Sequence, residues 1–288
     1  MVAPLFLAFL FPIPPSPIAP GATLQRLADG FSFTEGPVPD RAGNVYFTDQ
    51  PNDRILKWTV DGHVSEWMKP CGRANGMAFD KRGNLIACAD EHNQLWSISP
   101  AKTVDVLIRD YQGKLLNGPN DVWIRPDGGM YITDPLYARP YWTRSPKSQL
   151  PGQYVFFFRP GSEPVPEATD LQVPNGIVGT PDGKLLYIGD LGLNETIRYR
   201  IQRDGSLTDK TVFCHLGSDG MTLDARGDVY LSGHGVTVFD PKGDQIAHID
   251  VPQPWVGHVC FGGSDHKTLF ITACKGIYGM RMAVRGAY

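Results

Sequence analysis

The sequence predicts an all-β fold, a six-bladed β-propeller with four-stranded antiparallel blades, and three observations support this prediction. Glycine and proline are frequent, with 32 and 25 residues in a chain of 288, which suits many short strands joined by turns. One strand–turn–strand pattern recurs six times. The copies start between 39 and 55 residues apart, which leaves room for two further strands in each repeat and therefore for a four-stranded blade.

Each repeat begins with a polar residue, continues through an apolar strand and a tight turn, and ends in a second strand. Turn sequences such as DRAG, DKRG and PDG are typical of β-hairpins. The six copies are EGPVPDRAGNVYFTD from Glu35, NGMAFDKRGNLIACAD from Asn75, NDVWIRPDGGMYITD from Asn120, NGIVGTPDGKLLYIGD from Asn175, DGMTLDARGDVYLSG from Asp219 and HVCFGGSDHKTLFITA from His258.

Outer strands can be assigned in three of the repeats. The paired segments are 54–60 with 63–68, 94–99 with 104–109, and 196–202 with 210–216. The longest interval between repeats contains residues 136–158, which begin as an irregular segment rich in arginine and aromatic residues and end in an apolar strand. Long loops in compact domains often form walls or lids of functional sites, so this segment is either such a wall or an elaborated connection within a blade.

The chain divides into a leader and one domain. Residues 1–22 are apolar and proline-rich, which is typical of a signal peptide or of a disordered extension, and residues 23–288 make a single propeller domain. If the leader is a signal peptide, the protein is periplasmic or secreted, and the apolar run favours this interpretation. If it is not, we expect a cytoplasmic protein. The apolar run is too short to span a membrane.

The charge balance indicates what kind of partner to expect. Lys and Arg number 27 against 30 Asp and Glu, a formal net charge of −3, so there is no general basic field for nucleic acid. We therefore expect a small-molecule ligand, no membrane span, and a monomer or small homo-oligomer.

The polar residues that open the six repeats are the candidate site residues. The first strand of each propeller blade lines the central channel, so these residues form a ring around one axis. They are Glu35, Asn75, Asn120, Asn175, Asp219 and His258. Carboxylate and amide oxygens suit a hard divalent cation, with Ca²⁺ favoured and Mg²⁺, Mn²⁺ or Zn²⁺ as alternatives.

Each of these residues could instead be an ordinary turn residue at a strand entry, but their equivalence across the repeats favours a shared site. Glu35, Asn175 and Asp219 are the favoured metal ligands, and Asn120 is either a further ligand or a substrate contact. Asn75 either shapes a turn or contacts the substrate. His258 is a neutral ligand, a proton carrier, a substrate contact or a hydrogen-bonded channel residue, and we favour the last.

Four motifs resemble one family. TEGPVPD around Glu35, PNDV at Asn120, PNGI at Asn175 and SDGMTLD around Asp219 are similar to the SMP-30/gluconolactonase family of six-bladed propeller lactonases. The resemblance covers essentially the whole chain after the leader. It implies that Glu35, Asn175 and Asp219 bind the divalent metal, that Asp219 also serves as acid and base, and that Asn120 contacts substrate or metal.

Two positions depart from this family pattern. Some members have arginine two residues before the third-blade asparagine, where this chain has Gly118, and many have asparagine in the sixth blade, where it has His258. Both changes leave the metal site intact but bear on the substrate, because the missing arginine would have gripped sugar hydroxyls.

The expected activity is metal-dependent hydrolysis of a sugar lactone. A cation with open coordination positions polarises the lactone carbonyl, and Asp219 carries the proton to the ring oxygen. Two alternatives use the same ring. One is attack of the same water on phosphorus, as in propeller phosphotriesterases, and the other is a non-catalytic propeller that binds a sugar or a partner and uses the ion only for stability.

Overall fold

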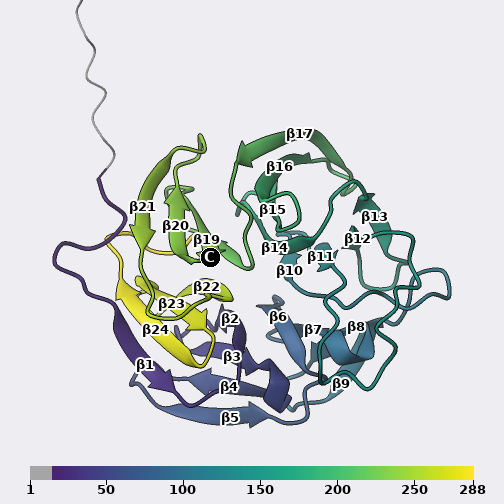
Figure 1. The fold of residues 1–288 in the computed structure, drawn as a ribbon, viewed down its shortest axis with the longest axis horizontal. Coiled ribbons are helices and arrows are strands. Elements are labelled where there is room, and N and C mark those ends of the chain that lie inside the picture. Colours follow the sequence, from purple (N-terminus) through teal and green to yellow (C-terminus); the bar gives the residue numbers. More distant parts are fainter. Residues whose placement is uncertain (1–14) are drawn as a thin grey trace, which may run out of the picture.

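The computed structural model describes residues 15–288 and contains six antiparallel sheets of four strands each, arranged around a central axis (Figure 1). The innermost strand of every sheet starts within two residues of the polar residue that opens a repeat. These strands are β2 (Thr34–Pro39), β6 (Ala74–Phe79), β10 (Val122–Ile124), β14 (Pro174–Gly179), β18 (Met221–Leu223) and β22 (His258–Gly262).

The second strand of each predicted hairpin also forms as expected. These strands are β3 (Val45–Asp49), β7 (Leu85–Ala89), β11 (Met130–Asp134), β15 (Leu185–Asp190), β19 (Val229–Gly233) and β23 (Thr268–Ala273). The inner strands contact one another in order, β2 with β6, β6 with β10, and onward to β22, which returns to β2. This closed ring confirms the predicted six-bladed propeller.

Two outer strands complete each blade, and the three predicted outer pairs are confirmed. The third strands are β4 (Arg54–Trp58), β8 (Gln94–Ile98), β12 (Tyr154–Phe158), β16 (Glu195–Ile201), β20 (Gly235–Phe239) and β24 (Gly276–Arg281). The outermost strands are β5 (Val64–Met68), β9 (Val104–Ile108), β13 (Val165–Ala168), β17 (Leu207–Cys214), β21 (Gln245–Ile249) and β1 (Gln25–Asp29). Two short 3₁₀ turns, η1 (Gln50–Asn52) and η2 (Asp90–His92), follow β3 and β7.

The last blade is completed from the opposite end of the chain. Strand β1 pairs antiparallel with β24, with Arg26 opposite Tyr278, so the first strand of the domain closes the ring. Part of the predicted leader continues this contact, because Ile18 forms a β-bridge with Met282. Residues 1–14 of that leader lie outside the described residues.

Aromatic residues near the start of the second strands pack between neighbouring blades. Tyr46 meets Phe79 of the next blade with ring centres 5.2 Å apart, and Tyr230 meets Phe261 at the same separation. Such edge-on pairs add about 0.5–1.5 kcal/mol to the gain from burial. This packing holds the blades at fixed angles and therefore fixes where their inner ends meet.

Within residues 15–288, no helix combines the length and the apolar character that crossing a membrane would need.

Candidate functional site

The predicted ring residues meet at one level of the channel because glycines next to them allow close approach. A Cβ on Gly36 would lie only 2.0 Å from the carbonyl oxygen of Asn75, so the strands of Glu35 and Asn75 can touch here only with glycine at position 36. The next step around the ring is a hydrogen bond of 2.7 Å from the Gly76 amide to the Asn120 carbonyl.

The opposite side of the ring is packed in the same way. A Cβ on Gly220 would lie 2.1 Å from Cγ of His258, and one on Gly257 would lie 2.6 Å from Oε1 of Glu35. Glu35 is therefore cradled against the backbone that leads to His258. Asp219, which precedes Gly220, sits beside this contact.

Bulges interrupt the strand pairing directly after three of the ring residues. The register shifts between Glu35 and Val38, between Ala74 and Met77, and between Pro174 and Ile177. A bulge bends the strand and re-aims its side chains.

Glu35 and Asp219 form a pair of neighbouring carboxylates. Glu35 is 4% exposed, and burial together with the charge of Asp219 raises its pKa to about 8. Burial also raises the pKa of Asp219, against the hydrogen bond that the Trp255 indole donates to its Oδ2 at 2.5 Å. Two buried carboxylates this close repel each other, and a cation between them would remove that repulsion.

Asn175 supplies a third oxygen. Its Nδ2 donates to the hydroxyl of Tyr137 at 3.3 Å, which fixes the orientation of the amide. Its Oδ1 is buried and finds no hydrogen-bond partner anywhere in the described part of the chain. A buried acceptor without a partner costs about 1–3 kcal/mol, so this oxygen is suited to a ligand that is not a protein group.

These donors fit a hard divalent cation. Nowhere in residues 15–288 do three His, Cys, Asp or Glu side chains gather as a metal-binding group. Two carboxylates therefore need an amide oxygen to complete a set of three ligands, and Oδ1 of Asn175 meets that need. An all-oxygen set favours Ca²⁺, Mg²⁺ or Mn²⁺ over softer ions.

His258 contacts Asp121, an aspartate that the sequence analysis did not select as a site residue. Its Nε2 lies 3.1 Å from Oδ2 of Asp121, and the same oxygen accepts a hydrogen bond from the Ile177 amide at 3.1 Å. Burial lowers the pKa of His258, but the charges of Asp121 and Glu35 outweigh it and raise the pKa to about 9. The favoured prediction of a hydrogen-bonded channel histidine agrees with this geometry.

The structure adds three further residues to the site: Asp121, Trp255 and Tyr137. Asp121 directly follows Asn120 in the PND motif, and Trp255 stands three residues before His258, so both were adjacent to motifs that the sequence revealed. Tyr137 lies in the irregular 136–158 segment, where no periodic pattern could place it. Asn75 and Asn120 lie in the ring, both buried, and their contact with a substrate stays a prediction.

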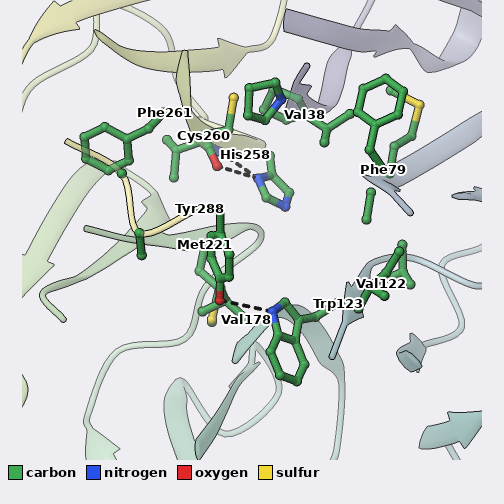
Figure 2. Close-up of a pocket in the computed structure, with 18 of the residues that line it drawn as sticks. Val38, Phe79, Val122, Trp123, Val178, Met221, His258, Cys260, Phe261 and Tyr288 are labelled. Carbon is green, nitrogen blue, oxygen red and sulfur yellow. Dashed lines mark hydrogen bonds between the residues drawn. The ribbon is translucent and has the colours of Figure 1, made fainter. Parts of the chain in front are cut away.

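On the other side of His258 and Asp121, the side chains that line the channel are mainly apolar. A cavity of about 410 Å³ opens there, lined by apolar side chains that include Val38, Phe79, Val178 and Met221 (Figure 2). The C-terminal Tyr288 enters it, and the Trp123 indole donates to the Tyr288 hydroxyl at 3.1 Å. None of the predicted metal ligands lines this end.

Comparison with known proteins supports the resemblance seen in the motifs. A curated gluconolactonase from Zymomonas mobilis is 27% identical over 91% of this chain and 82% of its own. A crystal structure of a gluconolactonase from Xanthomonas campestris has a TM-score of 0.83 at 28% identity, covering 92% of this chain and 91% of that one. An X-ray structure from the Northeast Structural Genomics Consortium has a TM-score of 0.88 at 34% identity, covering 94% and 96%.

The family model described as the SMP-30/gluconolactonase/LRE-like region matches residues 33–275, which is most of the chain and includes all six ring positions. The protein is therefore a member of the SMP-30/gluconolactonase/LRE-like family.

Proposed function

We propose that the protein is a hydrolase that opens a sugar lactone with the help of one divalent cation, Ca²⁺ being favoured. The proposal is supported by three features of this chain, which is related to gluconolactonases: the charge of Asp219 raises the pKa of Glu35, a side-chain hydrogen bond of Asn175 lowers the pKa of Asp219, and Oδ1 of Asn175 has no partner among the described residues. These three residues would hold the ion, with Asn120 as a fourth ligand or a substrate contact. A bound cation supplies polarisation of the lactone carbonyl and stabilises the negative charge that develops on its oxygen.

Asp219 is suited to move the proton. The indole of Trp255 donates to its Oδ2 and orients the carboxylate. With Oδ1 toward the ion, the second lone pair of Oδ2 would take the proton. In the reaction a water attacks the carbonyl carbon, the bond from this carbon to the ring oxygen breaks, and Asp219 takes the proton from the water and returns it to the ring oxygen. The product is a hydroxy acid.

Asn75, Asn120 and His258 would contact the substrate. Asn75 and Asn120 place planar amides around the channel at the level of the carboxylate pair, and amides can both donate to and accept from hydroxyl groups. His258 lies between the candidate site and the apolar cavity, and Asp121 contacts its Nε2. The imidazole would therefore keep the lactone at the polar end.

The proposal is tested with protein stripped by chelator and then given Ca²⁺, Mg²⁺, Mn²⁺ or Zn²⁺ in turn. Acid release from glucono-δ-lactone is followed in a pH-stat, with the spontaneous hydrolysis subtracted. We expect turnover to disappear on stripping and to return with at least one of the ions.

Two results would contradict lactone hydrolysis. Hydrolysis of a phosphotriester such as paraoxon without lactone opening would favour attack on phosphorus. Cation-dependent thermal stability with neither activity would favour a binding propeller.

A further inference from the structure

One connection is much longer than its counterparts, and it lies at the polar end of the channel. The second and third strands are joined by residues 50–53 in the first blade and 191–194 in the fourth, but by residues 135–153 in the third. The amide of Asn120 donates to the carbonyl of Thr133, at the end of β11, at 2.9 Å. The long connection therefore starts beside the ring.

Asp90 anchors this connection. Its carboxylate is 4% exposed, and it accepts hydrogen bonds from the Trp142 indole at 3.1 Å and from the Arg144 guanidinium at 3.2 Å. Arg144 also donates to the carbonyl of Asn117 at 2.7 Å. A segment from the third blade is thus held to the neighbouring second blade.

The side chains of Asp90 and Arg144 occupy the space beside Gly118. A Cβ on Gly118 would lie 2.4 Å from Oδ1 of Asp90 and 2.8 Å from Nη2 of Arg144. No larger residue fits at this position without moving the pair. The positive group beside Gly118 is therefore that of Arg144, which belongs to the long connection.

A second arginine of the connection, Arg139, packs against Tyr137, which belongs to the candidate site. The Arg139 guanidinium lies 5.1 Å from the ring centre of Tyr137, whose hydroxyl contacts Asn175. Its Nε is buried and has no hydrogen-bond partner among the described residues, and the Asp90 carboxylate stands 3.9 Å from it. Through Tyr137, the Arg139 guanidinium therefore stands one contact away from Asn175, at the polar end of the channel.

We infer that Arg139 is a substrate-contacting residue, which donates hydrogen bonds to the hydroxyl groups of a polyhydroxylated lactone bound at the ring. This inference rests on the proposed function. Arginine carries five donors in a fixed plane, and Arg139 holds donors that no protein group uses. A site built to bind hydroxyls discriminates strongly against analogues that lack them, because its buried donors are then left unpaired.

The test compares two lactones in the cation-loaded enzyme. Glucono-δ-lactone carries ring hydroxyls and δ-valerolactone carries none. We expect Arg139→Ala to lower kcat/KM for gluconolactone by about 10- to 100-fold, the loss of a hydrogen bond to a charged donor, and to change kcat/KM for valerolactone by less than about threefold. Arg139→Lys should recover part of the loss, because it restores a charged donor.

Lys147→Ala is the matched control, since it removes the same charge from an exposed position of the same connection. It should leave both lactones unaffected. Equal losses on both lactones in Arg139→Ala would overturn the inference, because Arg139 would then act on the cation site and not on substrate hydroxyls.

A binding measurement separates this inference from the proposed function. Titration calorimetry with gluconate, and with acetate as a carboxylate without hydroxyls, should show gluconate binding to the wild type that weakens about 10-fold or more in Arg139→Ala. If the wild type opens no lactone but shows this difference, the proposed function is wrong and the inference stands. If the wild type does not bind gluconate, or if Arg139→Ala binds it as tightly, the inference is wrong.

Discussion

The two ends of the channel are built from the same strands, but they differ in whether their polar groups have hydrogen-bond partners. On β2 and β14, Glu35 and Asn175 face the polar end, while Val38 and Val178, three residues further on, line the apolar cavity. The polar end keeps two neighbouring carboxylates and an amide oxygen without a partner. At the other end the Trp123 indole donates to the Tyr288 hydroxyl, which in turn donates to the Gly179 carbonyl.

This difference separates function from stability. Unpaired buried polar groups weaken a fold, and proteins keep them where a ligand completes them. Buried apolar side chains stabilise a fold without needing a ligand. Substitutions at the polar end should therefore change activity more than stability, and substitutions at the apolar end should do the reverse.

The largest effect is expected for Asp219→Asn. Loss of the proton carrier should reduce kcat for lactone opening by about 10²- to 10⁴-fold while the midpoint of thermal unfolding stays within a few degrees of the wild type. Asp61→Asn, which removes an exposed carboxylate from an outer turn, is the control and should keep full activity. A fully active Asp219→Asn would show that another group moves the proton.

At the apolar end, Met221→Ala should do the opposite. Met221 is 2% exposed and lines the cavity, so its truncation should cost about 2–5 kcal/mol in the free energy of unfolding. Urea denaturation measures this loss. The kcat/KM for lactone should stay within about threefold of the wild type. A large loss of kcat/KM in a folded Met221→Ala protein would mean that the two ends are not independent.

Cation binding should stabilise the polar end by a smaller amount. At a free concentration 100 times its Kd, an ion that binds only the folded protein adds about 2.7 kcal/mol. Differential scanning calorimetry of stripped protein with and without Ca²⁺ should show a higher unfolding temperature with the ion. Asn175→Ala should lose most of this increase, whereas an undiminished increase would remove Asn175 from the site.

The smallest effect is expected for Tyr288→Phe. The substitution keeps the ring but deletes the hydroxyl, which accepts a hydrogen bond from Trp123 and donates one to the Gly179 carbonyl. We expect a loss of about 0.5–1.5 kcal/mol in the free energy of unfolding, measured by urea denaturation, and no change in activity. A loss of turnover would indicate that the contacts of Tyr288 affect the polar end.

The sequence predicted the blades well because each hairpin is a local signal. Alternation, turn residues and the regular spacing from Glu35 to His258 are all visible in short windows. The pairing of β1 with β24 could not be predicted in this way, because it joins residues about 250 positions apart and has no signal of its own.

The sequence predicted only those site residues that occupy equivalent positions in the six repeats. Six equivalent positions revealed the ring, whereas Asp121 and Trp255 occur once and act through neighbours that only the fold provides. Tyr137, Arg139 and Arg144 lie in an irregular connection, and both arginines contact one buried carboxylate, Asp90, in another blade. Contacts of this kind follow from tertiary packing and not from local pattern.

The most direct test is diffraction from crystals soaked in Mn²⁺, recorded at a wavelength where manganese scatters anomalously. We predict a single strong peak in the channel, within bonding distance of carboxylate oxygens of Glu35 and Asp219 and of Oδ1 of Asn175. A peak at any other place, or an empty channel in crystals that diffract well after soaking, would contradict the cation site on which the proposed hydrolysis depends.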